Sequence, residues 1–114
     1  MTEVALKKSI LSLLSITMKS GNIKSGEFQT EEAVKGGQAG LVIIAEDASD
    51  NTKKKFKDKC TYYNVPIFFC FTKEEMAHAI GKTDRSSVAV TDQGLADSLI
   101  NKLSALKENK EEPV

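Results

Sequence analysis

Three carboxylates, Glu46, Asp47 and Asp50, follow an apolar run and form a candidate metal site. In an open α/β sheet, ligands bind beyond the carboxyl ends of the strands, and three carboxylates at such an edge could hold Mg²⁺. The same side chains could instead cap and charge-match the helix that follows them. Carboxylates often open helices, so we favour the capping interpretation and expect no bound metal.

The histidine, the cysteines and the glycine-rich segment lack the neighbouring residues that catalysis or phosphate binding would require. His78 is the only histidine, and we expect it on a helix surface or at the edge of the core. Cys60 and Cys70 stand among apolar residues, so neither resembles a thiolate activated by a base. The glycine-rich segment 36–40 follows a helix and precedes a strand, whereas a phosphate-binding loop opens a helix. We therefore predict a helix stop there, and a protein that is not an enzyme and uses no cofactor.

A cluster of lysines is the strongest charge feature. The segment from Asn51 to Lys59 holds five lysines and one aspartate, and it is predicted to be helical. Lysines four residues apart on a helix repel each other by about 0.2–0.5 kcal/mol per pair. Such a cluster fits either contact with a polyanion such as RNA or a merely solvated helix face, and the cluster alone does not separate the two.

Overall charge limits the kinds of nucleic-acid binding that are expected. Sixteen basic and sixteen acidic residues give a formal net charge of zero, which argues against coating nucleic acid by bulk charge. Arg85 is the only arginine, and arginine is the usual bidentate reader of guanine, so little base reading is expected. A local basic face remains compatible with this composition.

Periodic apolar residues predict the elements that position these groups. Stripes at three- and four-residue steps indicate helices, and the continuous run Leu41–Ala45 indicates a strand that is covered on both faces. A second buried strand is expected from Pro66 to Phe71, and the third helix should bury Phe56, Cys60 and Tyr63. The predicted helices are 3–19, 27–35, 50–63, 73–80 and one from 92 onward, and the predicted strands are 23–25, 41–45, 66–71 and 87–91. This alternation predicts an α/β protein, a three-layer α/β/α sandwich around a small sheet.

Length and composition predict one domain. A chain of 114 residues suits a single domain, which we place at 1–107, followed by a charged tail at 108–114. No apolar run approaches the roughly 20 residues of a membrane helix, and the N-terminus lacks the pattern of a secretory signal. Two cysteines without such a signal do not predict a disulfide framework. We expect a cytoplasmic protein without a membrane partner.

Several separate motifs in the correct order resemble one known family. They are LSLLSITMKSGNIKSG at 11–26, AGLVIIAEDAS at 39–49, NTKKK at 51–55, YYNVP at 62–66, HAIGK at 78–82 and VAVTDQG at 88–94. These segments are similar to the kink-turn RNA-binding ribosomal protein family, spoken as "L seven Ae" and "L thirty e", and most of all to its small bacterial YlxQ-type branch. The resemblance covers about residues 3–106.

The resemblance implies a three-layer fold with a mixed four-stranded sheet and a non-catalytic function in binding kink-turns, which are sharply bent RNA helices. Sheared base pairs in a kink-turn show edges that an ordinary RNA duplex hides. Family members begin the second helix with a pattern close to Gly-Asn-Glu-x-x-Lys. Here Gly26 matches the glycine, whereas Phe28, Gln29 and Glu32 replace the three polar residues. The implied partner is structured RNA, such as ribosomal RNA, bound by a monomer; the alternative is a protein-interaction module at the same surface.

The implied RNA site combines the second helix with the loop before the last strand. Gln29 can still donate and accept hydrogen bonds, Phe28 could stack on a base, and Glu32 would repel phosphate. The expected RNA-binding residues are Lys24, Gly26, Phe28, Gln29, Glu32, Lys35, Lys82, Arg85 and Ser86. Auxiliary phosphate contacts are expected from Lys19, Lys53, Lys54 and Lys57.

Overall fold

Helices and strands alternate along the whole described chain. The computed structural model describes the backbone of residues 2–111 and the side chains of residues 2–108. Five helices and four strands lie in this part, in the order that the sequence predicts. The helices are α1 (Glu3–Lys19), α2 (Glu27–Lys35), α3 (Asp50–Tyr63), α4 (Lys73–Ala79) and α5 (Gln93–Glu111), and the strands are β1 (Ile23–Ser25), β2 (Leu41–Ile44), β3 (Ile67–Phe69) and β4 (Ser87–Val90). None of these helices is both long and apolar enough to cross a membrane.

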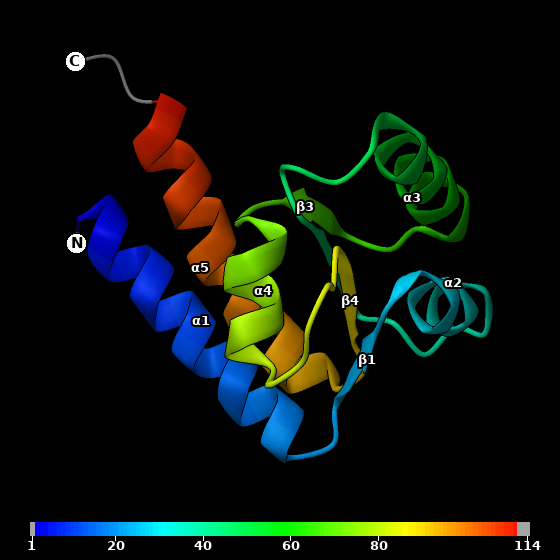
Figure 1. The fold of residues 1–114 in the computed structure, drawn as a ribbon, viewed down its shortest axis with the longest axis horizontal. Helices are drawn as coiled ribbons and strands as arrows, with labels where there is room; N and C mark the ends of the chain where they lie inside the picture. The colour runs from blue at the N-terminus through cyan, green and yellow to red at the C-terminus, as the bar shows by residue number, and fades with distance from the viewer. Residues whose placement is uncertain (1, 112–114) are drawn as a thin grey trace.

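The four strands form one mixed sheet in the order β1-β4-β2-β3. β4 runs antiparallel to both of its neighbours, and β2 runs parallel to β3. Helices α1, α4 and α5 cover one face of the sheet, and α2 and α3 cover the other (Figure 1). The predicted three-layer α/β/α sandwich with a mixed four-stranded sheet is therefore confirmed.

Two apolar clusters, one on each face of the sheet, make the core. On one face, Leu6, Ile10 and Leu14 of α1 and Leu99 and Leu103 of α5 are buried together, at the spacings that the helical stripes predict. The opposite cluster holds buried residues of α2, α3 and the sheet. Burial of apolar area on both faces explains why β2 and β4 have no exposed residue.

Side-chain caps define where four of the helices begin. Thr2, Ser49 and Asp92 each accept a hydrogen bond from the backbone N–H three residues further on, at 3.1, 3.1 and 2.9 Å. α4 begins with a capping box, in which Thr72 and Glu75 bond reciprocally. Gly36 ends α2, so the glycine-rich segment is the predicted helix stop.

Three details differ from the sequence predictions. β3 is an edge strand rather than a buried one, and the ring of Phe69 is 40% exposed. Tyr63 is also 40% exposed and does not join Phe56 and Cys60 in the core, because α3 has reached its last residue there. Helix α5 continues through Glu111 into the segment predicted as a tail, and residues 112–114 lie outside the described residues.

Candidate functional site

One end of the sheet gathers segments that lie far apart in the sequence. Ser25 ends β1, and Ser87 begins β4 opposite Ile44, the last residue of β2. The N–H of Gly26 donates to the Ser87 carbonyl at 3.0 Å, which ties the start of α2 to the loop before β4. We call residues 24–32 together with residues 81–87 the sheet-end surface.

Arg85 forms hydrogen bonds to both segments of the sheet-end surface, 24–32 and 81–87. Its Nε donates to Ser25 Oγ at 3.2 Å, and its Nη1 donates to the Thr83 carbonyl at 2.8 Å. A Cβ at Gly26 would lie 3.8 Å from Arg85 Nε, and Gly26 has φ +91°, which side chains rarely adopt. The glycine is therefore needed for the turn into α2, whereas a Cβ there would meet Arg85 at an ordinary van der Waals distance.

The first turn of α2 is open to solvent. Its cap residue is a glycine, so no side chain accepts a hydrogen bond from the first backbone N–H groups. The side chains of Phe28, Gln29 and Glu32 are exposed, and Phe28 is 74% exposed. Phe28 and Glu32 are four residues apart and therefore share one face of the helix. Three of the predicted RNA-binding residues thus surround the open helix start.

The remaining predicted residues are spread around this end. Lys24 is exposed on β1, Lys82 is exposed in the loop, and Ser86 is half-buried there. The loop begins beside α1, because Ser15, one turn before Lys19, donates to the Ala79 carbonyl.

Lys35 lies away from the start of α2. It occupies the opposite end of that helix, about 13 Å along the axis from Gly26, and it pairs with Glu31 at 3.8 Å. The structure therefore does not bring Lys35 to the start of α2.

The lysines of α3 fall into two sets with different surroundings. Lys55 and Lys59 face α2, where Glu31 lies 2.6 Å from Lys55 Nζ and 3.7 Å from Lys59 Nζ. Glu27 is 3.3 Å from Lys55 Nζ. The hydrogen bond from Lys55 holds the pKa of Glu31 below its usual value, and the same bond raises the pKa of Lys55. Sequence spacing gave no signal for these partners, because the pairs join different helices.

The second set of lysines borders the edge strand. Lys53, Lys54 and Lys57 line a groove of about 690 Å³ together with Glu46 and Phe69. Within the described part of the chain, Lys54 pairs with Asp58 at 2.9 Å, whereas neither Lys53 nor Lys57 forms an ion pair. Of the predicted auxiliary lysines on α3, Lys53 and Lys57 therefore have no ion-pair partner among the described residues, whereas Lys54 has one.

The acidic group after β2 has a capping role, but partly for a different helix. Asp47 Oδ1 accepts a hydrogen bond from the Lys73 N–H at 2.8 Å, so it caps α4, not α3 as predicted. Ser49 is the side chain that caps α3. Among the described residues, no three acidic, histidine or cysteine side chains gather closely enough to hold a metal ion.

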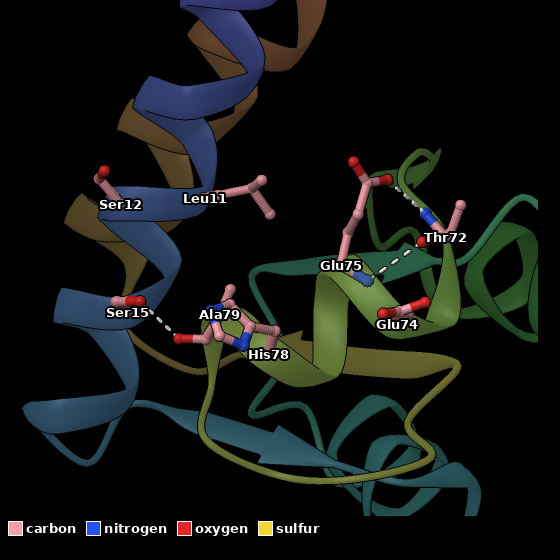
Figure 2. A pocket seen from close by; sticks show the side chains of 8 residues that line it. All are labelled: Leu11, Ser12, Ser15, Thr72, Glu74, Glu75, His78 and Ala79. Atoms are coloured by element: carbon pink, nitrogen blue, oxygen red, sulfur yellow. Dashed lines mark hydrogen bonds between the residues drawn. The ribbon is translucent and has the colours of Figure 1, made fainter.

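A second groove lies between α1 and α4. It has a volume of about 560 Å³ and is lined by Leu11, Ser12, Ser15, Thr72, Glu74, Glu75, His78 and Ala79 (Figure 2). Figure 2 shows that Ser15 bonds to α4 and that the capping box joins Thr72 and Glu75. His78 is exposed on α4, as predicted. The bonds drawn in this groove hold helices in place.

The cysteines belong to the core. Both are free and buried, which agrees with the prediction that they do not form a disulfide framework. Burial raises the pKa of the Cys60 thiol to about 11, so the reactive thiolate is scarce at neutral pH.

The fold and the matched sequence place the chain in a family. Residues 8–100 match the model of the Ribosomal protein L7Ae/L30e/S12e/Gadd45 family, and the chain belongs to that family. The resemblance expected from the sequence motifs is confirmed.

Comparison with individual relatives indicates which branch of the family the chain resembles most. The chain is 42% identical to the RNA-binding protein YlxQ of Bacillus subtilis over 91 residues, which are 80% of this chain and 91% of the relative. It is 38% identical to the protein of the same name from Enterococcus faecium, over 79% of this chain and 86% of the relative. These two matches support the YlxQ-type branch of the family.

Solved structures share the fold. A protein of unknown function from Bacillus halodurans superimposes with a TM-score of 0.81 at 36% identity, covering 83% of this chain and 96% of that one. The Giardia lamblia 15.5kD RNA binding protein gives a TM-score of 0.75 at 25% identity and covers 90% of each chain.

Proposed function

We propose that this chain is a non-catalytic RNA-binding protein of ribosomal type that recognises a kink-turn-like structured RNA through the sheet-end surface. Family membership and the names of its YlxQ relatives support RNA as the partner. The contact of Arg85 with Ser25, beside Gly26, is the observation that supports this position for the RNA site. It joins the open start of α2 to the loop that carries Lys82, which are the two segments that the family resemblance implies for RNA contact. We propose a cytoplasmic monomer, with ribosomal RNA as one source of the target.

Each part of the sheet-end surface has a role that its chemistry suits. The open N–H groups at the start of α2 carry partial positive charge and can bind a phosphate. Gln29 can bond to a base edge, and the exposed ring of Phe28 can stack on a base that leaves the helix. Lys82 contributes a phosphate contact, as lysines generally do in nucleic-acid complexes.

Equilibrium binding to two RNAs of equal length and composition tests the proposal. One RNA contains a kink-turn and the other forms a straight duplex, and both are titrated at two salt concentrations. We expect tighter binding to the kink-turn RNA and weaker binding to both at high salt. Equal affinity for the two RNAs would contradict kink-turn recognition, and absence of binding to either would contradict the RNA-binding proposal.

A protein-interaction module is the alternative, and Phe28 is the observation that favours it. An apolar ring that is 74% exposed, between acidic residues, also suits a protein partner. Replacing it in Phe28→Ser separates the alternatives. We expect the variant to lose kink-turn affinity; a variant that binds the kink-turn RNA as tightly as the original chain would favour the protein partner.

A further inference from the structure

Phe69 leaves the core because its strand forms the edge of the sheet. It pairs in register with Ile44 of β2, and the outer side of β3 has no neighbouring strand in the described sheet. Its ring is 40% exposed, while the side chain of Ile44 is fully buried. Because residues paired across a sheet point to the same face, Phe69 faces the layer that contains α3. An exposed aromatic ring therefore stands beside the basic helix.

Lysines on α3 form the other wall of the groove. Lys53 and Lys57 are four residues apart, so they share the helix face that borders Phe69. Neither has an ion-pair partner among residues 2–108, unlike Lys55 and Lys59. Keeping two uncompensated charges one turn apart costs some helix stability, which favours a function for them.

The groove lies at the same end of the sheet as the sheet-end surface. Ile44 pairs with Phe69 on one side and with Ser87 on the other. Two strand spacings of about 4.8 Å therefore separate Ser87 from Phe69, a distance of about 10 Å. A single RNA can contact both surfaces at once.

We propose that this groove binds an unpaired nucleotide that flanks the structured RNA, and the proposal rests on the proposed function. The base stacks on Phe69, and the phosphates on either side meet Lys53 and Lys57. Stacking on an exposed aromatic ring within a positive groove is the general way in which proteins hold unpaired nucleotides.

The test compares a kink-turn RNA with the same RNA carrying a single-stranded tail of four adenosines, placed at either end in separate experiments. With the original chain, we expect one tail to tighten binding by about tenfold. Phe69→Leu keeps an apolar side chain but removes the ring, so it should lose most of that gain and bind the tailless RNA unchanged. Tyr62→Leu is the matched control, because Tyr62 is 79% exposed on α3 but lines a different groove, beside Lys55 and Lys59.

Salt dependence gives a readout that does not rely on Phe69. Tail phosphates contact Lys53 and Lys57 directly, whereas a tailless RNA approaches these lysines only at longer range, so the slope of log K against log salt should steepen by about 1.4 for the tailed RNA. The double variant Lys53→Gln and Lys57→Gln should remove that difference. Equal binding of tailed and tailless RNA by the original chain, or an unchanged gain in Phe69→Leu, would overturn this proposal alone. Failure to bind the tailless kink-turn RNA would instead overturn the proposed function.

Discussion

Gly26 occupies a backbone conformation that belongs almost entirely to glycine. With φ +91° and ψ 155°, a side chain at this position strains the turn into α2. We expect Gly26→Ala to lower the free energy of unfolding by about 1–3 kcal/mol. RNA affinity should fall as well, because relief of the strained φ would displace the start of α2 from the loop that holds Arg85. Chemical denaturation measures the first effect and equilibrium binding the second.

Gly94→Ala is the matched control for this prediction. Gly94 is the second residue of α5 and lacks the positive φ of Gly26. Alanine at a compatible helical position usually stabilises a protein by about 0.4–1 kcal/mol. If both variants lose stability equally, the special backbone conformation of Gly26 is not what matters.

Glu32 places a negative charge on the exposed face of α2 that holds Phe28. In Glu32→Lys, a repulsion of phosphate is replaced by an attraction, so we expect tighter kink-turn binding and a steeper salt dependence. The fold should tolerate the change, because lysine and glutamate have similar helix propensities. Affinities at two salt concentrations check this, with Glu108→Lys on α5 as a control of equal charge change. Equal affinities and slopes for Glu32→Lys and the original chain would mean that this face does not approach RNA.

Among the secondary-structure elements, α3 carries two sets of lysines: one is proposed to contact RNA, and the other pairs with α2. Replacing Lys53, Lys54 and Lys57 by glutamine should weaken binding to kink-turn and straight RNA by the same factor and flatten the salt slope. Lysines are point charges that suit phosphates more than base edges, so the preference between the RNAs should stay. Salt titrations of both RNAs measure this; a lost preference with an unchanged slope contradicts it.

Lys55 and Lys59 supply the comparison on the same helix. Replacing both by glutamine removes the contacts of Glu31 to α3. We expect this double variant to change RNA affinity less than the triple variant, and to lower thermal stability more.

Glu31 links α2 to α3 and makes their contact dependent on pH. Its pKa is lowered in the folded chain, chiefly by the hydrogen bond from Lys55, so the ionised form stabilises the fold. That stabilisation is present above the ordinary value of 4.5 and is lost as the pH falls through the lowered pKa. Glu31→Gln should therefore cost up to about 1 kcal/mol at pH 7, and the difference should vanish in strong acid. Denaturation curves at several pH values measure this, with Glu32→Gln as the control that keeps the pairs.

The helices and strands that were predicted correctly are those whose burial follows from a local, periodic pattern of residues. The run Leu41–Ile44 and the stripe of α5 bury what their spacing indicates, because strands and helices repeat every two and 3.6 residues. The position of a strand within the sheet follows from tertiary pairing instead. For that reason Phe69 could not be identified as an edge residue, although the strand itself was predicted.

Parts of the candidate site were predicted from the family motif, and parts were not. The motif pointed to Gly26 and the loop 81–87, and Ser25 beside Gly26 contacts Arg85 of that loop through a hydrogen bond between side chains 60 residues apart. Lys55 and Glu27 are 28 residues apart and lie on different helices, so no periodic pattern in the sequence could predict their contact. The capping of α4 by Asp47 spans 26 residues and was missed for the same reason.

For the whole molecule, RNA contacts should gather at one end of the sheet. In an NMR titration with the kink-turn RNA, we expect the largest amide shifts in residues 24–32 and 81–87. Smaller shifts should follow along α3 near Lys53. The apolar contact between α1 and α5 on the opposite face should be little affected. Shifts concentrated on α5 would place the RNA elsewhere and would refute the assignment of the sheet-end surface.

The strand order has a consequence for how the chain acquires its structure during synthesis. β1 and β2 do not pair with each other, and β4, the last strand to be made, joins them. Until residues 87–90 have left the ribosome, β1 has no strand to pair with, although α1 and α2 can already form. Closing such distant pairs is slow, because a long loop must be ordered first. β2 and β3 pair with each other and can do so earlier, but β1 joins the sheet only after β4 has been made.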